Sequence, residues 1–95
     1  MPVSVDAAVR DNPARSRFEL DANGATAVAD YKLADGVITF THTEVPEAAR
    51  GGGIASRLVA GALQAARARG LKVVARCPFF AGYIERHPEY RDLLA

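Results

Sequence analysis

Three consecutive glycines, at positions 51 to 53, separate a segment typical of a β-strand from a segment typical of an amphipathic helix. Glycine adopts backbone angles that other residues rarely take, and it places no Cβ between the peptide N–H groups and an approaching ligand. Apolar residues recur at helical spacing after the glycines, which predicts a helix that begins at about Gly53. The first N–H groups of a helix have no intrahelical acceptor and carry partial positive charge, and Arg50 precedes them. The stretch therefore predicts an anion site of the size of a phosphate.

Two other kinds of glycine-rich loop do not fit this stretch. A P-loop ends in Gly-Lys-Ser or Gly-Lys-Thr, whereas this turn continues as Gly53-Ile54-Ala55. A dinucleotide-binding loop that began at Gly51 would require glycine or alanine where Ser56 stands, and an acidic residue about 20 positions later. The later position holds Arg76-Cys77. A glycine cluster that only turns the chain remains an alternative interpretation.

Length and composition limit the classes of protein. The chain has 95 residues, of which 49% are apolar, and this predicts one compact domain near the lower size limit for a single core. We expect a loose N-terminal arm or partial edge strand over residues 1–15 and a single domain over 16–95. A net charge of +1 gives no electrostatic case for nucleic acid, and no segment is apolar enough for a membrane span. One cysteine and no signal-peptide pattern predict a cytoplasmic protein.

Hydrophobic periodicity predicts a small α/β (α+β) domain. Alternating residues predict three antiparallel strands, joined by tight turns at Asn23-Gly24 and Asp35-Gly36. The strand, helix and strand that follow predict a crossover to a parallel neighbour. The expected fold is an antiparallel hairpin sheet continued by one parallel strand, with helices packed on the sheet. The expected strands cover residues 17–20, 25–33, 37–45 and 71–77, and the expected helices cover 53–69 and 79–87, with a turn or short helix over 89–94.

The third expected strand changes character along its length. Strict alternation places His42 and Glu44 on the same face as Ile38 and Phe40, so that this face turns from apolar to ionisable where the strand ends. Ligands of open parallel units bind outside the carboxyl ends of the strands. We therefore expect the site at the end of this strand, beside the glycine turn and near Cys77.

These residues carry a resemblance to a known family. Arg50-Gly51-Gly52-Gly53-Ile54-Ala55 fits the Arg/Gln-x-x-Gly-x-Gly/Ala signature of the GNAT superfamily of acyl-CoA-dependent N-acyltransferases. The segments Thr43-Glu-Val-Pro46, Arg76-Cys77-Pro78-Phe79 and His87-Pro88 extend the match, so that residues 17 to 94 resemble the small single-domain GNAT-like branch. The resemblance implies the same fold and the acetyl-CoA-dependent transfer of an acetyl group to an amine by direct attack.

The resemblance also implies how acetyl-CoA would bind. The amides of the glycine turn would hold the pyrophosphate, and the pantetheine arm would lie where residues 41–45 and 73–77 splay apart. Backbone groups around Glu44 and Val45 would pair with pantetheine, and one strand N–H would polarise the thioester carbonyl. The acceptor amine, on a small molecule or a protein, is not identified by the sequence. The cofactor-binding residues implied in this way are Thr43, Val45, Arg50, Gly51, Gly52, Gly53, Ile54, Ala55, Cys77 and Phe79.

Three residues are candidates for catalysis, and each has an alternative interpretation. Glu44 or His42 could remove the proton from the acceptor ammonium, directly or through water, although polar residues at a strand end often only meet solvent. Cys77 could line the acyl end of the pocket or accept the acetyl group transiently, or it could be a small buried residue. The two histidines and the one cysteine are not spaced in the sequence as the ligands of a metal ion usually are.

The chain also departs from larger members of the superfamily. Its hairpin strands begin almost at once, where larger members usually have one or two N-terminal helices that help to shape the acceptor site. Many of those members carry a tyrosine that protonates the leaving thiolate, but Ile84 occupies that position here. The neighbouring Tyr83 is therefore either this acid or a core residue. A regulatory module that binds CoA with little or no catalysis is the alternative function.

Overall fold

The structure is a computed structural model that describes residues 9–95. In this part of the chain it contains five strands and two α-helices, in the order expected from the sequence. The strands are β1 (Arg10–Asn12), β2 (Arg17–Ala22), β3 (Ala25–Ala34), β4 (Val37–Glu44) and β5 (Lys72–Ala75). The helices are α1 (Ile54–Ala68) and α2 (Pro78–Arg86), and the 3₁₀ turns are η1 (Pro13–Arg15), η2 (Glu47–Ala49) and η3 (Pro88–Leu93).

The five strands form one sheet in the order β1-β2-β3-β4-β5. The first four strands pair antiparallel, and β4 pairs with β5 in parallel. Both residues of the turns Asn23-Gly24 and Asp35-Gly36 have positive φ, between 53° and 78°, which is the geometry of a tight two-residue hairpin. The sheet therefore confirms the predicted hairpins, the parallel crossover through α1 and the α/β fold class.

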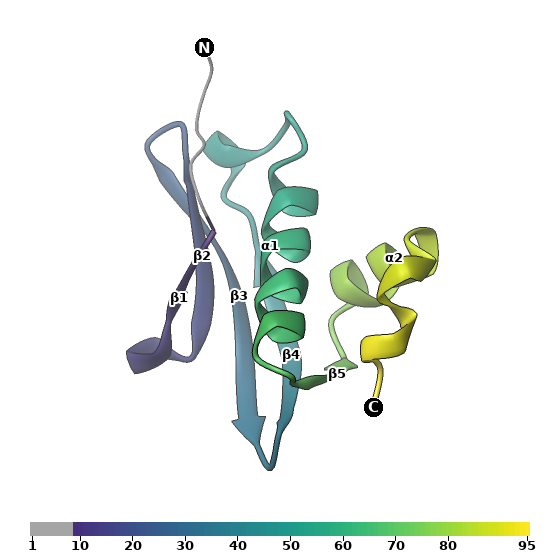
Figure 1. Cartoon of the computed structure of the whole chain (residues 1–95). Helices are drawn as coiled ribbons and strands as arrows, with labels where there is room; N and C mark the ends of the chain where they lie inside the picture. The colour runs from purple at the N-terminus through teal and green to yellow at the C-terminus, as the bar shows by residue number, and fades with distance from the viewer. Residues whose placement is uncertain (1–8) are drawn as a thin grey trace.

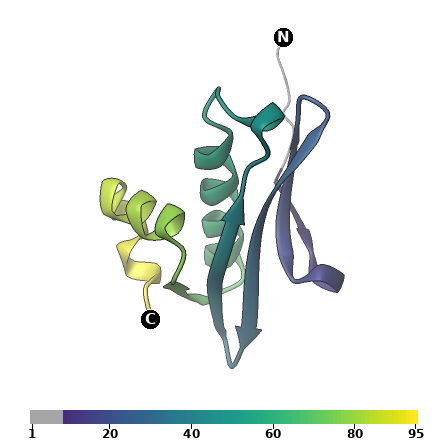
Figure 2. The same ribbon diagram turned by 180° about the vertical axis from the view of Figure 1, so that it is seen from behind.

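Both α-helices lie on one side of the sheet (Figure 1), and the hydrophobic core fills the space between them and the strands. The ring of Phe40 on β4 stacks on the ring of Phe80 on α2, with centroids 3.9 Å apart. In the view from behind, no helix of the described residues lies in front of β3 and β4 (Figure 2). We call this uncovered surface, which carries Asp30, His42 and Glu44, the bare face. No helix within residues 9–95 has the length and apolar character that a membrane span requires.

A β-bulge interrupts β4 near its end. Tyr31 pairs with Phe40, but the preceding residue of β3, Asp30, pairs with His42. Thr41 is therefore an extra residue on β4, opposite the step between Asp30 and Tyr31. A bulge of this kind shifts the following residues by one position, so that each side chain turns to the other face of the sheet.

The bulge overturns one prediction about the faces of this strand. Phe40 is fully buried against the helices, and beyond the bulge Thr43 and Val45 are buried as well, with 7% and 9% of their surface exposed. His42 and Glu44 lie on the bare face and are exposed. The prediction that His42 and Glu44 continue the face of Phe40 is wrong, because strict alternation does not persist through a bulge.

The N-terminal strand lies at the edge of the sheet and is held there by side chains. Residues 10–12 pair with β2, whereas residues 1–8 of the predicted arm lie outside the described residues. The hydroxyl of Tyr31 donates a hydrogen bond to one carboxylate oxygen of Asp11 at 2.7 Å. The guanidinium of Arg69, at the end of α1, forms an ion pair with the other oxygen at 3.2 Å. These contacts join the edge strand to both β3 and the helix layer.

Candidate functional site

The glycine turn connects η2 to α1 and faces open space. Gly51, Gly52 and Gly53 have φ angles of 92°, 60° and 75°, and all three residues are exposed. A Cβ built on any of them would meet no atom within 4 Å. The left-handed backbone, rather than crowding by neighbouring atoms, therefore requires glycine here.

Several amides of this turn have no acceptor in the protein. The N–H of Ile54 donates to the carbonyl oxygen of Gly51 at 3.3 Å, and the N–H of Arg50 donates to that of Glu47 at 3.2 Å. No oxygen of residues 9–95 accepts a hydrogen bond from the N–H groups of Gly51, Gly52, Gly53, Ala55 or Ser56. These free donors surround the start of α1, where the helix dipole adds partial positive charge. The turn thus has the chemistry of an anion site, although the amides of Arg50 and Ile54 are already used.

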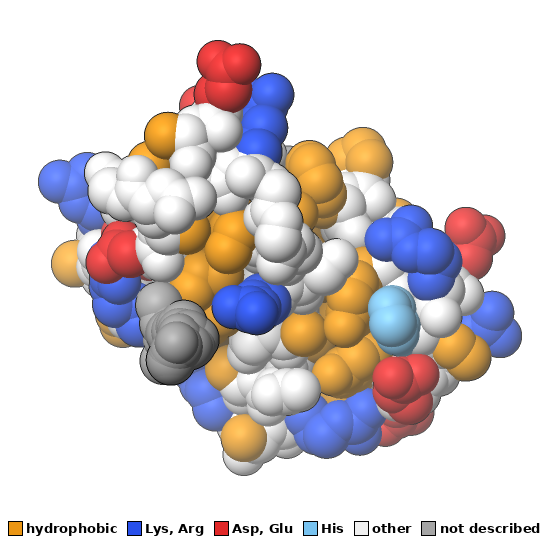
Figure 3. Space-filling view, turned by 90° about the horizontal axis from the view of Figure 1, so that it is seen from above, with side chains coloured by type: hydrophobic (Ala, Val, Ile, Leu, Met, Phe, Trp, Pro, Cys, Tyr) orange, Lys and Arg blue, Asp and Glu red, His pale blue; other side chains and the backbone are white. Residues whose placement is uncertain are grey.

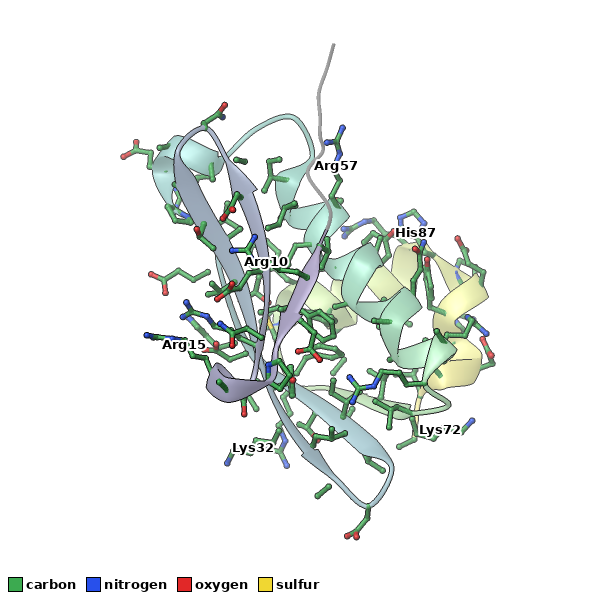
Figure 4. The ribbon with its side chains drawn as sticks, turned by 60° about the vertical axis from the view of Figure 1, so that its left-hand side comes forward. Arg10, Arg15, Lys32, Arg57, Lys72 and His87 are labelled. Carbon is green, nitrogen blue, oxygen red and sulfur yellow. The ribbon has the colours of Figure 1, made fainter. Side chains whose placement is uncertain are left out.

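Arg50 connects the glycine turn to the end of β4. Its Nε donates to the carbonyl oxygen of Val45 at 3.0 Å. That carbonyl oxygen is among the backbone groups expected to pair with pantetheine, and here it is occupied by Arg50. The terminal nitrogens of Arg50 make no hydrogen bond within the described residues and so remain available for an anion. Arg57 extends from the first turns of α1 into solvent, at the end of the helix that carries the turn (Figure 4).

The strands β4 and β5 separate close to this turn. Their pairing ends at Phe40 and Ala75, and the N–H groups of Arg76 and Cys77 both donate to the carbonyl oxygen of Phe40 at 3.1 Å. Residues 41–44 of β4 continue with β3 alone as their partner. We call the place where the pairing of β4 with β5 ends the strand divergence. The predicted splay is therefore present, but it starts later along β5 than expected, because the residues of β5 up to Ala75 stay paired with β4.

Cys77 lies at the base of the strand divergence, between β5 and α2. Only 3% of its surface is exposed, and its thiol donates to the hydroxyl oxygen of Thr43 at 3.1 Å. Reactive cysteines lie in partly exposed, electropositive surroundings, whereas buried structural cysteines are inert. The arrangement therefore favours a packing or lining role for Cys77 over transient acylation, and the lining role stays a prediction.

The two candidate bases lie on the opposite side of the sheet from this thiol. The side chains of His42 and Glu44 are 61% and 71% exposed, and His42 Nε2 is 3.8 Å from Glu44 Oε1. Both follow the bulge, which turns them to the bare face. The structure therefore brings these two residues together but separates them from Cys77, so a base at either position would act from the bare face.

The two adjacent phenylalanines of α2 have different surroundings. Phe80 is buried, whereas Phe79 is 48% exposed and lines a hollow of about 310 Å³ together with Pro78 and Arg86. The end of the molecule that carries the glycine turn also exposes apolar side chains (Figure 3). Phe79 was a candidate from the sequence but Arg86 was missed, although a spacing of seven residues places both on one face of a helix.

Tyr83 belongs to the core of the α2 region. It is 9% exposed, and its ring stacks on that of His87 with centroids 4.1 Å apart. Burial, followed by the nearby Tyr90, raises the pKa of the Tyr83 hydroxyl. The phenol is therefore protonated at neutral pH, and its burial agrees with the core interpretation.

Comparisons with known proteins agree with this geometry. A family model described as "GCN5-related N-acetyl-transferase" matches residues 17–93. The solution structure of a "GCN5-like putative N-acetyltransferase" from Staphylococcus aureus superimposes with a TM-score of 0.68 at 26% sequence identity, covering 92% of this chain and 86% of that chain. No curated protein matches the chain. Because the family match extends from β2 to η3, the chain belongs to the GCN5-related N-acetyltransferase family.

Proposed function

We propose that the protein transfers the acetyl group of acetyl-CoA to an amine by direct attack in a ternary complex. The observation that carries this proposal is the set of free N–H groups at Gly51–Gly53 and at the start of α1. Donors in this arrangement bind phosphate groups, and the diphosphate of CoA would supply them. The hydrogen bond from Arg50 to Val45 holds the turn beside the end of β4, where the strand divergence begins. One extended ligand could therefore reach both places.

The strand divergence offers backbone groups for the acyl end of the ligand. Residues 41–44 of β4 have one edge without a partner strand among the described residues. An N–H on that edge would donate to the thioester carbonyl oxygen, and the loss of one such donor typically lowers the rate about 10²- to 10³-fold. The three glycines of the turn would then contact the diphosphate, and Phe79, near the start of α2 and two residues after Cys77, would contact another part of the cofactor.

The transfer itself requires one new bond and one proton acceptor. The amine nitrogen attacks the thioester carbon, the C–S bond breaks, and the sulfur leaves as the CoA thiolate, which takes a proton from solvent. The amine must also lose a proton. Glu44 or His42 would accept it on the bare face, directly or through a water molecule. This assignment is supported by their exposure, which lets an amine of any size approach them.

Release of the CoA thiol in the presence of a panel of amines tests the proposal. The panel should contain polyamines, small metabolite amines and lysine-containing peptides. Turnover with any of these acceptors would support the transferase. Acetyl-CoA binding without turnover on any of them would instead support the CoA-binding regulatory module, and the absence of binding would reject both functions.

A pair of glycine variants tests the role of the turn. Gly52→Ala places a Cβ at φ 60°, and the control Gly36→Ala does the same at φ 76° in a hairpin away from the site. Neither Cβ would meet an atom within 4 Å, so both variants should lose similar stability from backbone strain alone. Only Gly52→Ala should weaken acetyl-CoA binding in calorimetry. Equal affinities of the two variants would argue against the turn as the diphosphate site.

A further inference from the structure

Asn23, in the tight turn between β2 and β3, contacts the segment that leads into the glycine turn. Its side-chain Nδ2 donates a hydrogen bond to the carbonyl oxygen of Ala48 in η2 at 3.1 Å. The tip of this hairpin lies beside η2, at the end of the molecule that carries the glycine turn (Figure 1, Figure 2). Ala48 precedes Gly51 by three residues. The hairpin therefore holds the chain close to the point where the free N–H groups begin.

The glycine turn has little support of its own. Glycine loses more conformational freedom than other residues when its backbone is fixed, and three glycines follow one another here. The N–H groups of Arg50 and Ile54 make long hydrogen bonds at the two ends of the turn, at 3.2 and 3.3 Å. Burial of Ala49 fixes the chain on the core side of η2. The amide of Asn23 adds a fixed point that belongs to another part of the sheet.

The hairpin that carries Asn23 is itself well held. Asn23 and Gly24 have φ angles of 53° and 78°, and asparagine is among the few residues that take a positive φ readily. Next to the turn, the hydroxyl of Thr26 donates to the carboxylate of Asp21 at 2.7 Å, and Arg10 donates to the same carboxylate at 3.0 Å. These contacts join the hairpin to β1. The side chain of Asn23 thus extends from a braced turn to a segment that needs support.

We propose that Asn23 is a positioning residue that holds the glycine turn in the conformation that binds the diphosphate of CoA. This inference rests on the proposed function, because it assigns to Asn23 the preparation of that anion site without a contact to the ligand. When the binding conformation is populated only part of the time, the apparent affinity falls in proportion to that fraction. Loss of the contact from Asn23 to Ala48 would lower this fraction and leave the strand divergence as it is.

Calorimetry with CoA measures the effect of removing the amide. Asn23→Gly gives a Gly-Gly pair, which suits this type of turn, and it removes the hydrogen-bond donor. It should raise the dissociation constant for CoA about three- to tenfold, the effect of one hydrogen bond. Asn23→Asp also tolerates a positive φ and lacks a donor, so it should weaken binding as well. The matched control is Asp35→Gly, at φ 55° in the same position of the other hairpin, where the side chain makes no hydrogen bond within residues 9–95. This control should bind CoA like the wild type.

A truncated donor substrate separates positioning from general damage to the fold. S-acetylpantetheine has the thioester and the pantetheine arm but no diphosphate, so the glycine turn cannot contribute to its use. Asn23→Gly should raise KM for acetyl-CoA without lowering kcat, and it should leave kcat/KM for S-acetylpantetheine unchanged. A merely structural role of Asn23 would lower kcat/KM for both donor substrates.

Each outcome decides the proposal. Equal CoA affinity of the wild type and Asn23→Gly would overturn it, and a loss confined to Asn23→Asp would do the same, because it would show an effect of the added charge. Equal losses of kcat/KM with both donor substrates would also overturn it. A wild-type protein that binds no CoA would reject the proposed function itself, whereas normal binding in both the wild type and Asn23→Gly would reject only the role of Asn23.

Discussion

Gly61 lies inside α1, where alanine would ordinarily be the more stable residue. Replacing glycine by alanine in a helix interior gains about 0.8–1.0 kcal/mol of folding free energy. At this position, however, a Cβ would lie 2.5 and 2.6 Å from two side-chain carbon atoms of Val9, one of which is its Cβ. The Cβ of Val9 cannot move by side-chain rotation. The backbone just before β1 would therefore have to shift.

The free-energy cost of this steric clash decides whether Gly61→Ala stabilises or destabilises the protein. Overpacking of this kind typically costs about 1–3 kcal/mol, which cancels or exceeds the gain in helix propensity. Gly82, inside α2, is the matched control, because the nearest atom to a Cβ there is a terminal nitrogen of Arg86 at 3.4 Å. That nitrogen ends a flexible side chain and can move at little cost. Gly82→Ala should therefore stabilise the protein by about 1 kcal/mol, and Gly61→Ala should not.

Urea denaturation followed by circular dichroism measures both effects. We expect Gly61→Ala to be less stable than Gly82→Ala by about 1–3 kcal/mol, and each kcal/mol corresponds to roughly 4–8 °C in Tm for a domain of this size. Adding Val9→Gly to Gly61→Ala should recover part of the loss, because glycine removes the Cβ of Val9 that the new methyl group would meet. If Gly61→Ala and Gly82→Ala stabilise the protein equally, Val9 does not pack on α1 as described.

Three further predictions concern turnover and pH. Glu44→Gln should lower kcat without weakening acetyl-CoA binding, and equal losses in steady-state kinetics and calorimetry would remove Glu44 from the role of base. Burial, assisted by the hydrogen bond to Asp11, raises the pKa of Tyr31 from 10 to about 12, so its stabilising effect is complete below pH 10 and is lost as the pH rises toward 12. Unfolding free energies measured across this range should fall with pH in the wild type and less so in Tyr31→Phe. The hydrogen bond from Arg17 lowers the pKa of Glu19 below 4.5, so the carboxylate stabilises the fold above pH 4.5 and this effect is lost on further acidification. Glu19→Gln should reduce the fall in unfolding free energy below pH 4.5, and an unchanged fall would show that Glu19 does not contribute.

Local chemistry made most of the fold predictable. The pairs Asn23-Gly24 and Asp35-Gly36 place residues that tolerate positive φ at both central positions of a two-residue turn, and this fixes the hairpins independently of the rest of the chain. The glycine turn was likewise evident, because three positive φ angles in succession require glycine. Gly70 ends α1 with φ 69° for the same reason. Signals of this kind act over two or three residues, so one sequence reveals them.

Features that depend on distant residues were not predictable in this way. For residues 10–12 the sequence left a loose arm and a partial edge strand as alternatives, because they have no apolar alternation; the strand is held by ion pairs from Arg10 to Glu19 and Asp21 on the next strand. The bulge could not be seen in the sequence because Thr41 and Thr43, on either side of His42, are small polar residues that fit either face of the sheet. The contact between Thr43 and Cys77 joins residues 34 positions apart, and no local sequence pattern predicts it.

The position of the bulge follows from the cost of the alternative register. If Thr41 paired regularly with β3, His42 and Glu44 would turn toward the helices and Val45 would turn toward solvent. Burial of an ionised, unpaired side chain costs several kcal/mol, and exposure of a buried valine adds about 1.5–3 kcal/mol. The bulge, by contrast, gives up about one ladder hydrogen bond, with a net worth of about 0.5–1.5 kcal/mol. The bulged pairing costs less free energy than the regular pairing. The sequence therefore favours the bulge whether or not a ligand is bound.

This constraint also explains why the site is divided between two faces. The same rotation that keeps His42 and Glu44 in water turns the Thr43 hydroxyl toward Cys77, in the strand divergence. Groups that would contact the ligand therefore lie on the helix side, and groups that would accept a proton lie on the bare face. Deletion of Thr41 removes only the extra residue, so that His42 follows Phe40 directly, His42 and Glu44 stay on the bare face, and Thr43 stays on the side of Cys77. A folded deletion variant should therefore keep its CoA affinity in calorimetry, and exposure of Thr43 together with loss of that affinity would contradict this account of the two faces.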